Sequence, residues 1–205
     1  MITIFHVPNT RGFRVIWLCE ELGEPYQLEK VDFSAEYRAG ADWRRMKPVG
    51  KVPVMTDGDV KLFESGAIVQ YLLDRRGDGL LQPPRGTSEH GLYLQWCWFA
   101  EATFSRMTGE IANHKRAFAD APIEPVLEEM RNRARDCMRA LDEAVHGKQF
   151  LLGDTFSAAD IMMGYCAQSF SRNVGDEIPP NAAAWWERMQ ARPAFQAAVA
   201  ANRMK

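Results

Sequence analysis

The segment KPVGKVPVMTDGDVKLFESGAIVQYL, residues 47–72, decides the fold of the N-terminal part of this chain. Two short β-type runs, VPVM and VKLF, flank an Asp-Gly pair, and such a pair between two β runs is a strong hairpin signal. Directly afterwards, residues 64–76 predict a helix whose start is marked by Glu64 and Ser65. The segment therefore predicts a strand, a tight turn, a second strand and a helix, in that order.

Upstream of this segment the chain predicts a strand, a helix and another strand. MITIFHV (1–7) is rich in apolar and β-branched residues. Over 11–22 apolar residues recur with helical spacing, and Gly23 supplies a stop. YQLEKVDF (26–33) then predicts a strand that runs parallel to the first, because a helix separates the two. The order β-α-β followed by β-β-α is the thioredoxin-like arrangement.

Downstream the strand signals disappear. GDGLLQPPRGT (77–87) is rich in Gly and Pro and predicts a linker. The helical stretches that follow cover about 88–116, 122–146, 157–171 and 182–192, with a short tail after Pro193. The expected fold class is therefore α/β plus all-α: a thioredoxin-like domain over 1–76, the linker over 77–87 and an all-helical domain over 88–205.

Composition narrows the range of partners. Of the 205 residues 46% are hydrophobic and 25% charged, and the formal net charge is −2, so we expect a globular protein with no general attraction to nucleic acid or to an anionic membrane. We find no signal-peptide pattern, no apolar run long enough to span a bilayer and no metal-ligand spacing among the four scattered cysteines. We therefore expect a cytoplasmic protein with reduced thiols, no metal and a small-molecule partner.

Pro53 stands at the head of a predicted strand, where its missing N–H is a disadvantage. An X-Pro bond adopts the cis form at a cost of only about 0.5–1 kcal/mol. A cis bond would turn the main-chain N–H and C=O of Val52 away from the sheet. Those two groups could then pair with an extended peptide by strand addition.

Three charged or polar residues near Pro53 suit the ends of such a peptide. Ser65 opens a helix, and a helix N-terminus favours a carboxylate. Glu64 could meet an ammonium group, and Lys51 could reach a second carboxylate. A short peptide with a carboxylate and an ammonium at one end and a carboxylate at the other fits this pattern, and glutathione is such a molecule.

Three motifs carry a family resemblance: TRGFRVIWLCEELGEPY (10–26), the segment 47–72 and GDTFSAADIMM (153–163). Together, and in this order, they resemble the cytosolic glutathione S-transferases, and the N-terminal site looks like that of bacterial, serine/threonine-type, theta-like members. The resemblance implies a cytoplasmic detoxification enzyme that uses glutathione as co-substrate. The glutathione contacts that it implies are Thr10, Lys51, Val52, Pro53 (as a cis proline), Glu64 and Ser65. In the third motif, Ser157 and Asp160 predict a capping box with a structural role.

The reaction needs a thiolate, and an ordinary thiol with a pKa near 8.5 is mostly protonated at neutral pH. In serine-type members of the family the activating hydroxyl precedes an arginine by four residues, so Arg14 indicates Thr10 as the catalytic residue. Asn9 and Arg11 are retained as alternative donors to sulfur. Cys19 lies inside the first helix on its apolar face, which disfavours disulfide exchange through a protein cysteine.

The family pattern also implies an electrophilic, apolar second substrate bound between the two domains. Its candidate contacts are Trp98, Ala102, Phe104, Met107 and Phe170. A homodimer is expected, with Tyr93, Trp96 and Glu101 as candidate interface residues. Three alternatives to conjugation stay open. The first is another glutathione-dependent enzyme, such as an isomerase, a dehalogenase or a peroxidase. The second is a non-catalytic ligand carrier, and the third is a partner-binding module. The acceptor, the pathway and the exact class are not encoded in any motif that we can read.

Overall fold

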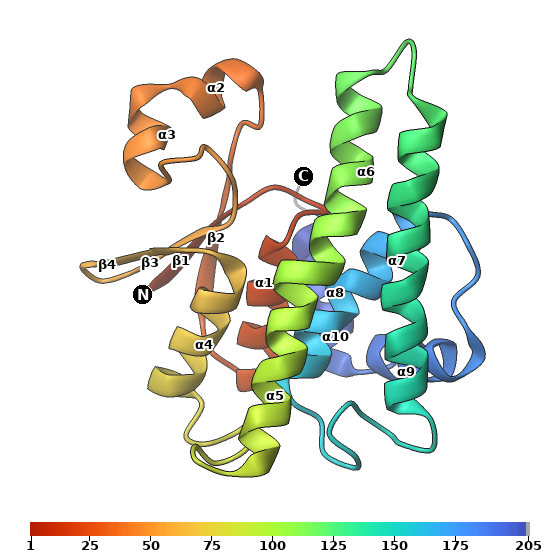
Figure 1. Ribbon diagram of the computed structural model, residues 1–205. Helices are drawn as coiled ribbons and strands as arrows, with labels where there is room; N and C mark the ends of the chain where they lie inside the picture. Colours follow the sequence, from red (N-terminus) through yellow and green to blue (C-terminus); the bar gives the residue numbers. More distant parts are fainter. Residues whose placement is uncertain (204–205) are drawn as a thin grey trace. The chain divides into compact units, whose positions relative to one another are not determined.

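The computed structural model describes residues 1–203, which fall into two compact units (Figure 1). The first unit comprises Met1–Leu80 together with the segment from Ala191 onward, and the second comprises Leu81–Gln190. The expected fold class is confirmed: a thioredoxin-like unit with a mixed sheet and an all-helical unit. The exact boundaries at 76 and 88 stay a prediction.

The first unit is built on a four-stranded sheet with the order β2-β1-β3-β4. Its strands are β1 (Ile2–His6), β2 (Tyr26–Lys30), β3 (Val54–Asp57) and β4 (Val60–Phe63). β1 pairs in parallel with β2 and antiparallel with β3, and β3 pairs antiparallel with β4. The predicted parallel pair and the predicted hairpin are therefore both confirmed.

Glycines with a left-handed backbone conformation end one helix and one strand of this unit. Helix α1 (Gly12–Leu22) ends at Gly23, whose φ of 63° suits a residue without a Cβ. The β3–β4 hairpin turns through Gly58, with φ of 59°, and Asp59. Helix α4 (Ser65–Arg76) follows β4 directly, as the sequence predicted.

Two short helices, α2 (Ala35–Ala39) and α3 (Ala41–Met46), were not predicted. The side chain of Ser34 caps α2 by accepting a hydrogen bond from the Tyr37 N–H at 3.2 Å. From α3, Trp43 packs into a hydrophobic cluster that also contains Val31, Val52 and Val54. These helices are too short to show a clear helical period, so only their packing reveals them.

The last helix, α10 (Pro193–Asn202), packs against α1 in the first unit, although we expected it to belong to the helical domain. The ring of Phe195 meets the ring of Trp17 edge-on, with centroids 4.9 Å apart. Arg192 forms a bidentate ion pair with Glu21, with N–O distances of 2.6 and 2.7 Å. The sequence predicted this segment only as a short tail after Pro193, and local sequence carries no information about the partner that a helix covers.

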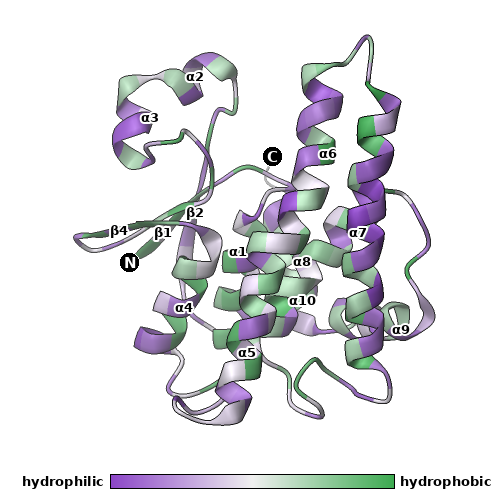
Figure 2. Ribbon diagram, in the orientation of Figure 1, coloured by the Kyte–Doolittle hydropathy of each residue, from purple (hydrophilic) through white to green (hydrophobic). Residues whose placement is uncertain are grey.

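The second unit contains only helices and loops within the described residues. These are α5 (Ser88–Trp98), a π-helical turn η1 (Phe99–Phe104), α6 (Ser105–Ala117), α7 (Glu124–Val145), α8 (Ala158–Asn173) and α9 (Pro180–Gln190). Figure 2 shows α7 as largely hydrophilic, and its buried residues, among them Leu127, Met138 and Leu141, lie on one face. Nowhere in residues 1–203 is a helix both long and apolar enough to cross a membrane.

The predicted capping box at the start of α8 is confirmed. The carboxylate of Asp160 accepts hydrogen bonds from the Ser157 and Leu151 N–H groups, at 3.0 and 2.9 Å, and from the Trp185 indole at 3.0 Å. Burial raises the pKa of Asp160, and these hydrogen bonds oppose the shift. Asp160 therefore joins α8, α9 and the preceding loop, and its role is structural.

Candidate functional site

One end of the sheet gathers the loops that carry the predicted site residues. Val54 in β3 pairs on one side with the last residues of β1 and on the other with the last residue of β4. Val52, two residues before Val54, therefore lies near the chain that leaves β4 and begins α4 at Ser65. The loop that carries Thr10 leaves β1 at this same end. Strand register alone brings these three segments together.

Val52 lies at this end of the sheet, two residues before the start of the β1–β3 pairing. The Val52–Pro53 peptide bond is cis, as the sequence analysis expected. The side chain of Val52 is buried in the cluster around Trp43, and the residue lies outside the β1–β3 ladder, which ends at Val54. Lys51, just before it, is exposed.

The start of α4 is prepared for an anion. Ser65 is its first residue, so the unpaired N–H groups of the first turn and the positive end of the helix dipole lie here. The fully buried Arg14 of α1 donates a hydrogen bond from Nη1 to Ser65 Oγ at 3.1 Å. Arg14 entered the sequence analysis only as a marker for Thr10, and its position behind Ser65 adds a fixed cation to this helix terminus.

Glu64 precedes Ser65 with φ of 71° and ψ of 113°. A positive φ is uncommon for a residue with a side chain, and such outliers concentrate at binding sites. Its carboxylate is half-exposed, with one oxygen 3.0 Å from the ammonium of Lys47, whose side chain is only 3% exposed. No sequence pattern indicates that Lys47 pairs with Glu64, since a separation of 17 residues matches neither a helical nor a strand period.

Thr10 lies in the turn between β1 and α1, and it does not cap the helix; the capping position is occupied by Arg11. Its hydroxyl donates to the Val7 carbonyl at 2.7 Å and lies 3.5 Å from Nδ1 of the buried His6. Nε2 of His6 lies 2.7 Å from Oδ1 of Asn202 in α10, so we assign the imidazole proton to Nε2. Burial lowers the pKa of His6, which keeps the ring neutral.

The two alternative donors flank Thr10. Asn9 is exposed and has φ of 65°, a left-handed conformation that asparagine tolerates better than most residues. Arg11 is partly exposed and precedes the first residue of α1. The turn therefore presents three polar side chains, and the single Thr10 proton is held by a main-chain carbonyl in this structure.

Comparison with known proteins identifies the family. Residues 1–74 match the family model described as glutathione S-transferase, N-terminal domain, and residues 124–200 match the one described as glutathione S-transferase, C-terminal domain. The chain belongs to the glutathione S-transferase family.

Individual relatives resemble nearly the whole chain. Glutathione S-transferase 3 of Schizosaccharomyces pombe is 25% identical, over 97% of this chain and 87% of its own length. The disulfide-bond oxidoreductase YfcG of Escherichia coli is 27% identical, over 95% and 92%. A glutathione transferase family member from Pseudomonas fluorescens, solved with two glutathione molecules bound, superposes with a TM-score of 0.84 at 25% identity, over 97% and 92%.

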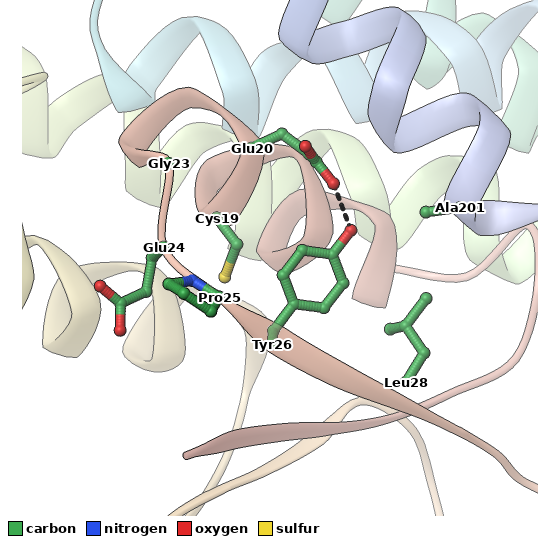
Figure 3. Close-up of a pocket in the computed structure, with 8 residues that line it drawn as sticks. All are labelled: Cys19, Glu20, Gly23, Glu24, Pro25, Tyr26, Leu28 and Ala201. Atoms are coloured by element: carbon green, nitrogen blue, oxygen red, sulfur yellow. Dashed lines mark hydrogen bonds between the residues drawn. The ribbon is translucent and has the colours of Figure 1, made fainter.

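Of the four cysteines, Cys19 is the nearest to the predicted site in sequence. It is fully buried, and Figure 3 shows its sulfur directed toward Pro25 and Tyr26. Burial, with smaller contributions from Glu24 and Glu20, raises the pKa of Cys19 to about 12. Cys19 is therefore protonated at neutral pH and unsuited to nucleophilic attack.

Cys19, Pro25 and Tyr26 also line a cavity of about 600 Å³ in the first unit, between α1, β2 and α10 (Figure 3). Two carboxylates, Glu20 and Glu24, contribute to its lining, and no lysine or arginine is among the described lining residues to bind the carboxylates of a peptide. Glu20 accepts a hydrogen bond from the Tyr26 hydroxyl, and Glu24 forms an ion pair with Arg76 at 3.1 Å. This cavity is therefore a poor place for glutathione.

The residues expected to contact the second substrate separate into two groups. Trp98 is 66% exposed, Ala102 is exposed and Met107 is partly exposed. Phe104 and Phe170, in contrast, are buried and contact each other with ring centroids 6.2 Å apart. For these two rings the expectation is corrected: they belong to the core of the helical unit, because each fills space between packed helices.

One candidate dimer contact is also corrected. Tyr93 is fully buried beside the ring of His90, with centroids 5.6 Å apart, so its ring does not reach the surface. Trp96 and Glu101 are partly exposed. Helical spacing placed all three on one long helix, but it did not reveal which face of that helix is covered.

Proposed function

We propose that this chain binds glutathione as the thiolate and transfers it to a small, apolar electrophile. Family membership and the full-length similarity to named glutathione S-transferases support glutathione conjugation. The observation that carries the proposal is the start of α4, where the buried Arg14 supports Ser65 beside Glu64. This arrangement supplies a carboxylate site, as one end of glutathione requires, with the Glu64 carboxylate beside it.

We assign each part of glutathione to a residue at this end of the sheet. The γ-glutamyl carboxylate is bound by Ser65 and the first turn of α4, and the neighbouring ammonium faces Glu64. The cysteinyl main chain pairs with Val52 beside Pro53. The glycyl carboxylate is bound by Lys51, which is exposed and free to extend along a ligand.

The chemistry consists of one nucleophilic displacement. The thiol loses its proton to solvent, the sulfur lone pair forms a bond to an electrophilic carbon, and the leaving group departs with its bonding electrons. Lowering the thiol pKa by two units corresponds to about 2.7 kcal/mol, within the range of one well-placed hydrogen-bond donor. We assign this donor to Thr10, whose hydroxyl proton turns from the Val7 carbonyl to the sulfur when glutathione binds. This is the serine/threonine-type, theta-like activation expected from the sequence.

The test compares Thr10→Ala with Asn9→Ala and Arg11→Ala. For Thr10→Ala we expect at least a tenfold lower rate with a chlorodinitrobenzene-type acceptor, a raised pKa of bound glutathione in the pH–rate profile, and nearly unchanged glutathione affinity. Unchanged kinetics in Thr10→Ala, with a tenfold loss in one of the other two variants, would assign the activation to that residue. Failure of the wild-type protein to bind glutathione at millimolar concentration in calorimetry would refute the function itself.

For the acceptor, we propose contacts from Trp98, Ala102 and Met107. These apolar side chains all reach the surface, and apolar surface suits an aromatic electrophile. We also propose a homodimer, since Val60 and Phe63 on the edge strand β4 and Leu92 on α5 are exposed apolar residues. Sedimentation at micromolar concentration tests the oligomer. A cytoplasmic location and a role in detoxification belong to the same proposal.

A second candidate function is glutathione-dependent reduction of small disulfides. It is favoured by the 27% identity to the E. coli protein named as a disulfide-bond oxidoreductase. In that reaction the glutathione thiolate would attack one sulfur of the substrate disulfide, forming a mixed disulfide and releasing the other sulfur as a thiolate. A panel of aryl halides, peroxides, isomerisable enones and disulfides, each with and without glutathione, separates the two functions.

A further inference from the structure

The ion pair between Lys47 and Glu64 alters the ammonium site before any ligand arrives. Lys47 Nζ lies 3.0 Å from Glu64 Oε1 and 5.0 Å above the centre of the Phe63 ring. The Lys47 side chain is 3% exposed, so it is held in place by its surroundings and is not a mobile surface lysine. Glu64 is therefore already paired with a fixed cation.

A ligand ammonium that approaches Glu64 meets a carboxylate whose charge is largely neutralised. It is also repelled by the Lys47 ammonium on the other side of that carboxylate. A hydrogen bond between an ammonium and a free carboxylate is worth roughly ten- to a hundredfold in affinity. Next to Lys47 most of this gain is absent, while the anion site at Ser65 and Arg14 is unaffected.

The charges at the site point in the same direction. Arg14, Lys47 and the exposed Lys51 are cations, and Glu64 is the facing carboxylate. Together with the positive end of α4, this set attracts the two carboxylates of glutathione more strongly than it attracts its ammonium. A peptide that lacked the ammonium would carry one more unit of net negative charge and would lose little.

We propose that Lys47 is a specificity-determining residue that makes the site nearly indifferent to the α-amino group of its peptide ligand. This inference rests on the proposed glutathione site. The substrate class then includes γ-linked thiol peptides without a free amine. The simplest member is glutaryl-cysteinylglycine, which has both carboxylates and the thiol of glutathione but no amino group.

The experiment measures the dissociation constants of glutathione and glutaryl-cysteinylglycine by calorimetry. In the wild-type protein we expect the two constants to agree within about threefold. In Lys47→Met, which keeps a long apolar side chain and removes the charge, glutathione should bind at least tenfold more tightly than the amine-free peptide. Lys30→Met, at an exposed lysine of β2, is the matched control and should keep the wild-type ratio.

Glu64→Gln provides the complementary variant. It removes the carboxylate that the ammonium would contact. The dissociation constant of the amine-free peptide should then be no higher than that of glutathione. The same result is expected when Glu64→Gln is combined with Lys47→Met. A wild-type preference for glutathione of tenfold or more overturns the inference, and this result needs no variant to fold. A Lys47→Met ratio equal to that of the wild-type protein also overturns it. Binding of neither peptide by the wild-type protein refutes the proposed function, a result distinct from both of these.

Discussion

The substitution Gly12→Ala tests how closely α1 approaches β1 beside the turn that carries Thr10. Gly12 is the first residue of α1, and its backbone does not require a positive φ. A Cβ built at this position would lie 2.3 Å from Nδ1 of His6, and real Cβ atoms essentially never come within 3.0 Å of such an atom. His6 is fully buried and bound to Asn202 at 2.7 Å, so its ring has no room to withdraw.

The expected effect has two opposing parts. Replacing a helical glycine with alanine stabilises a protein by about 0.5–1 kcal/mol when space is available. Forcing an extra methyl group into a packed interior costs about 1–3 kcal/mol, and displacing His6 from Asn202 adds about 1 kcal/mol for the lost hydrogen bond. We therefore expect the free energy of unfolding to fall by roughly 1–3 kcal/mol.

The assay is urea unfolding, followed by far-ultraviolet circular dichroism. Gly91→Ala is the control, because Gly91 is an exposed residue of α5 with open space around a Cβ, and it should raise stability by about 0.5–1 kcal/mol. A double-mutant cycle with His6→Ala should show that most of the Gly12→Ala cost disappears when the ring is absent. A Gly12→Ala protein as stable as the wild type, or an equal cost in the His6→Ala background, would refute the steric reasoning.

Two further predictions concern thiols and acid stability. With Ellman's reagent at pH 8 we expect one rapidly reacting thiol, the partly exposed Cys97. Burial raises the pKa of Cys19 to about 12 and that of Cys137 to about 11, and Cys166 is fully buried. Cys97→Ser should abolish the rapid phase, and rapid labelling that survives would contradict this. Hydrogen bonds from Arg76 hold the pKa of Asp57 in the folded protein below its usual range. The ionised Asp57 therefore stabilises the fold at any pH above about 3.9, the pKa of an aspartate in the unfolded chain. This stabilisation is lost as the pH falls through the lower pKa of the folded protein. Urea midpoints measured at pH 5 and pH 3 should therefore differ less in Asp57→Asn than in the wild-type protein, and an equal difference would show that this pair does not contribute.

Local sequence signals determined the order of elements in this protein. The Asp-Gly hairpin, the stop at Gly23 and the capping box at Ser157 all depend on residues close together in the chain, and each is present in the structure. The cis bond before Pro53 was expected from the family resemblance, whereas Glu64 and Ser65 at the start of α4 follow from the local pattern. Short-range geometry allows few alternatives at these positions, so residue type and spacing are sufficient.

Tertiary structure decided which distant groups meet. Nothing in the spacing of Lys47 and Glu64, or of His6 and Asn202, indicates that they pair, because these contacts follow from the packing of whole elements. Tertiary structure likewise decided that Phe104 and Phe170 lie in the core and that α10 covers α1. Helical periodicity shows that a helix has an apolar face, but the identity of its partner depends on how all the apolar faces of the chain are buried together.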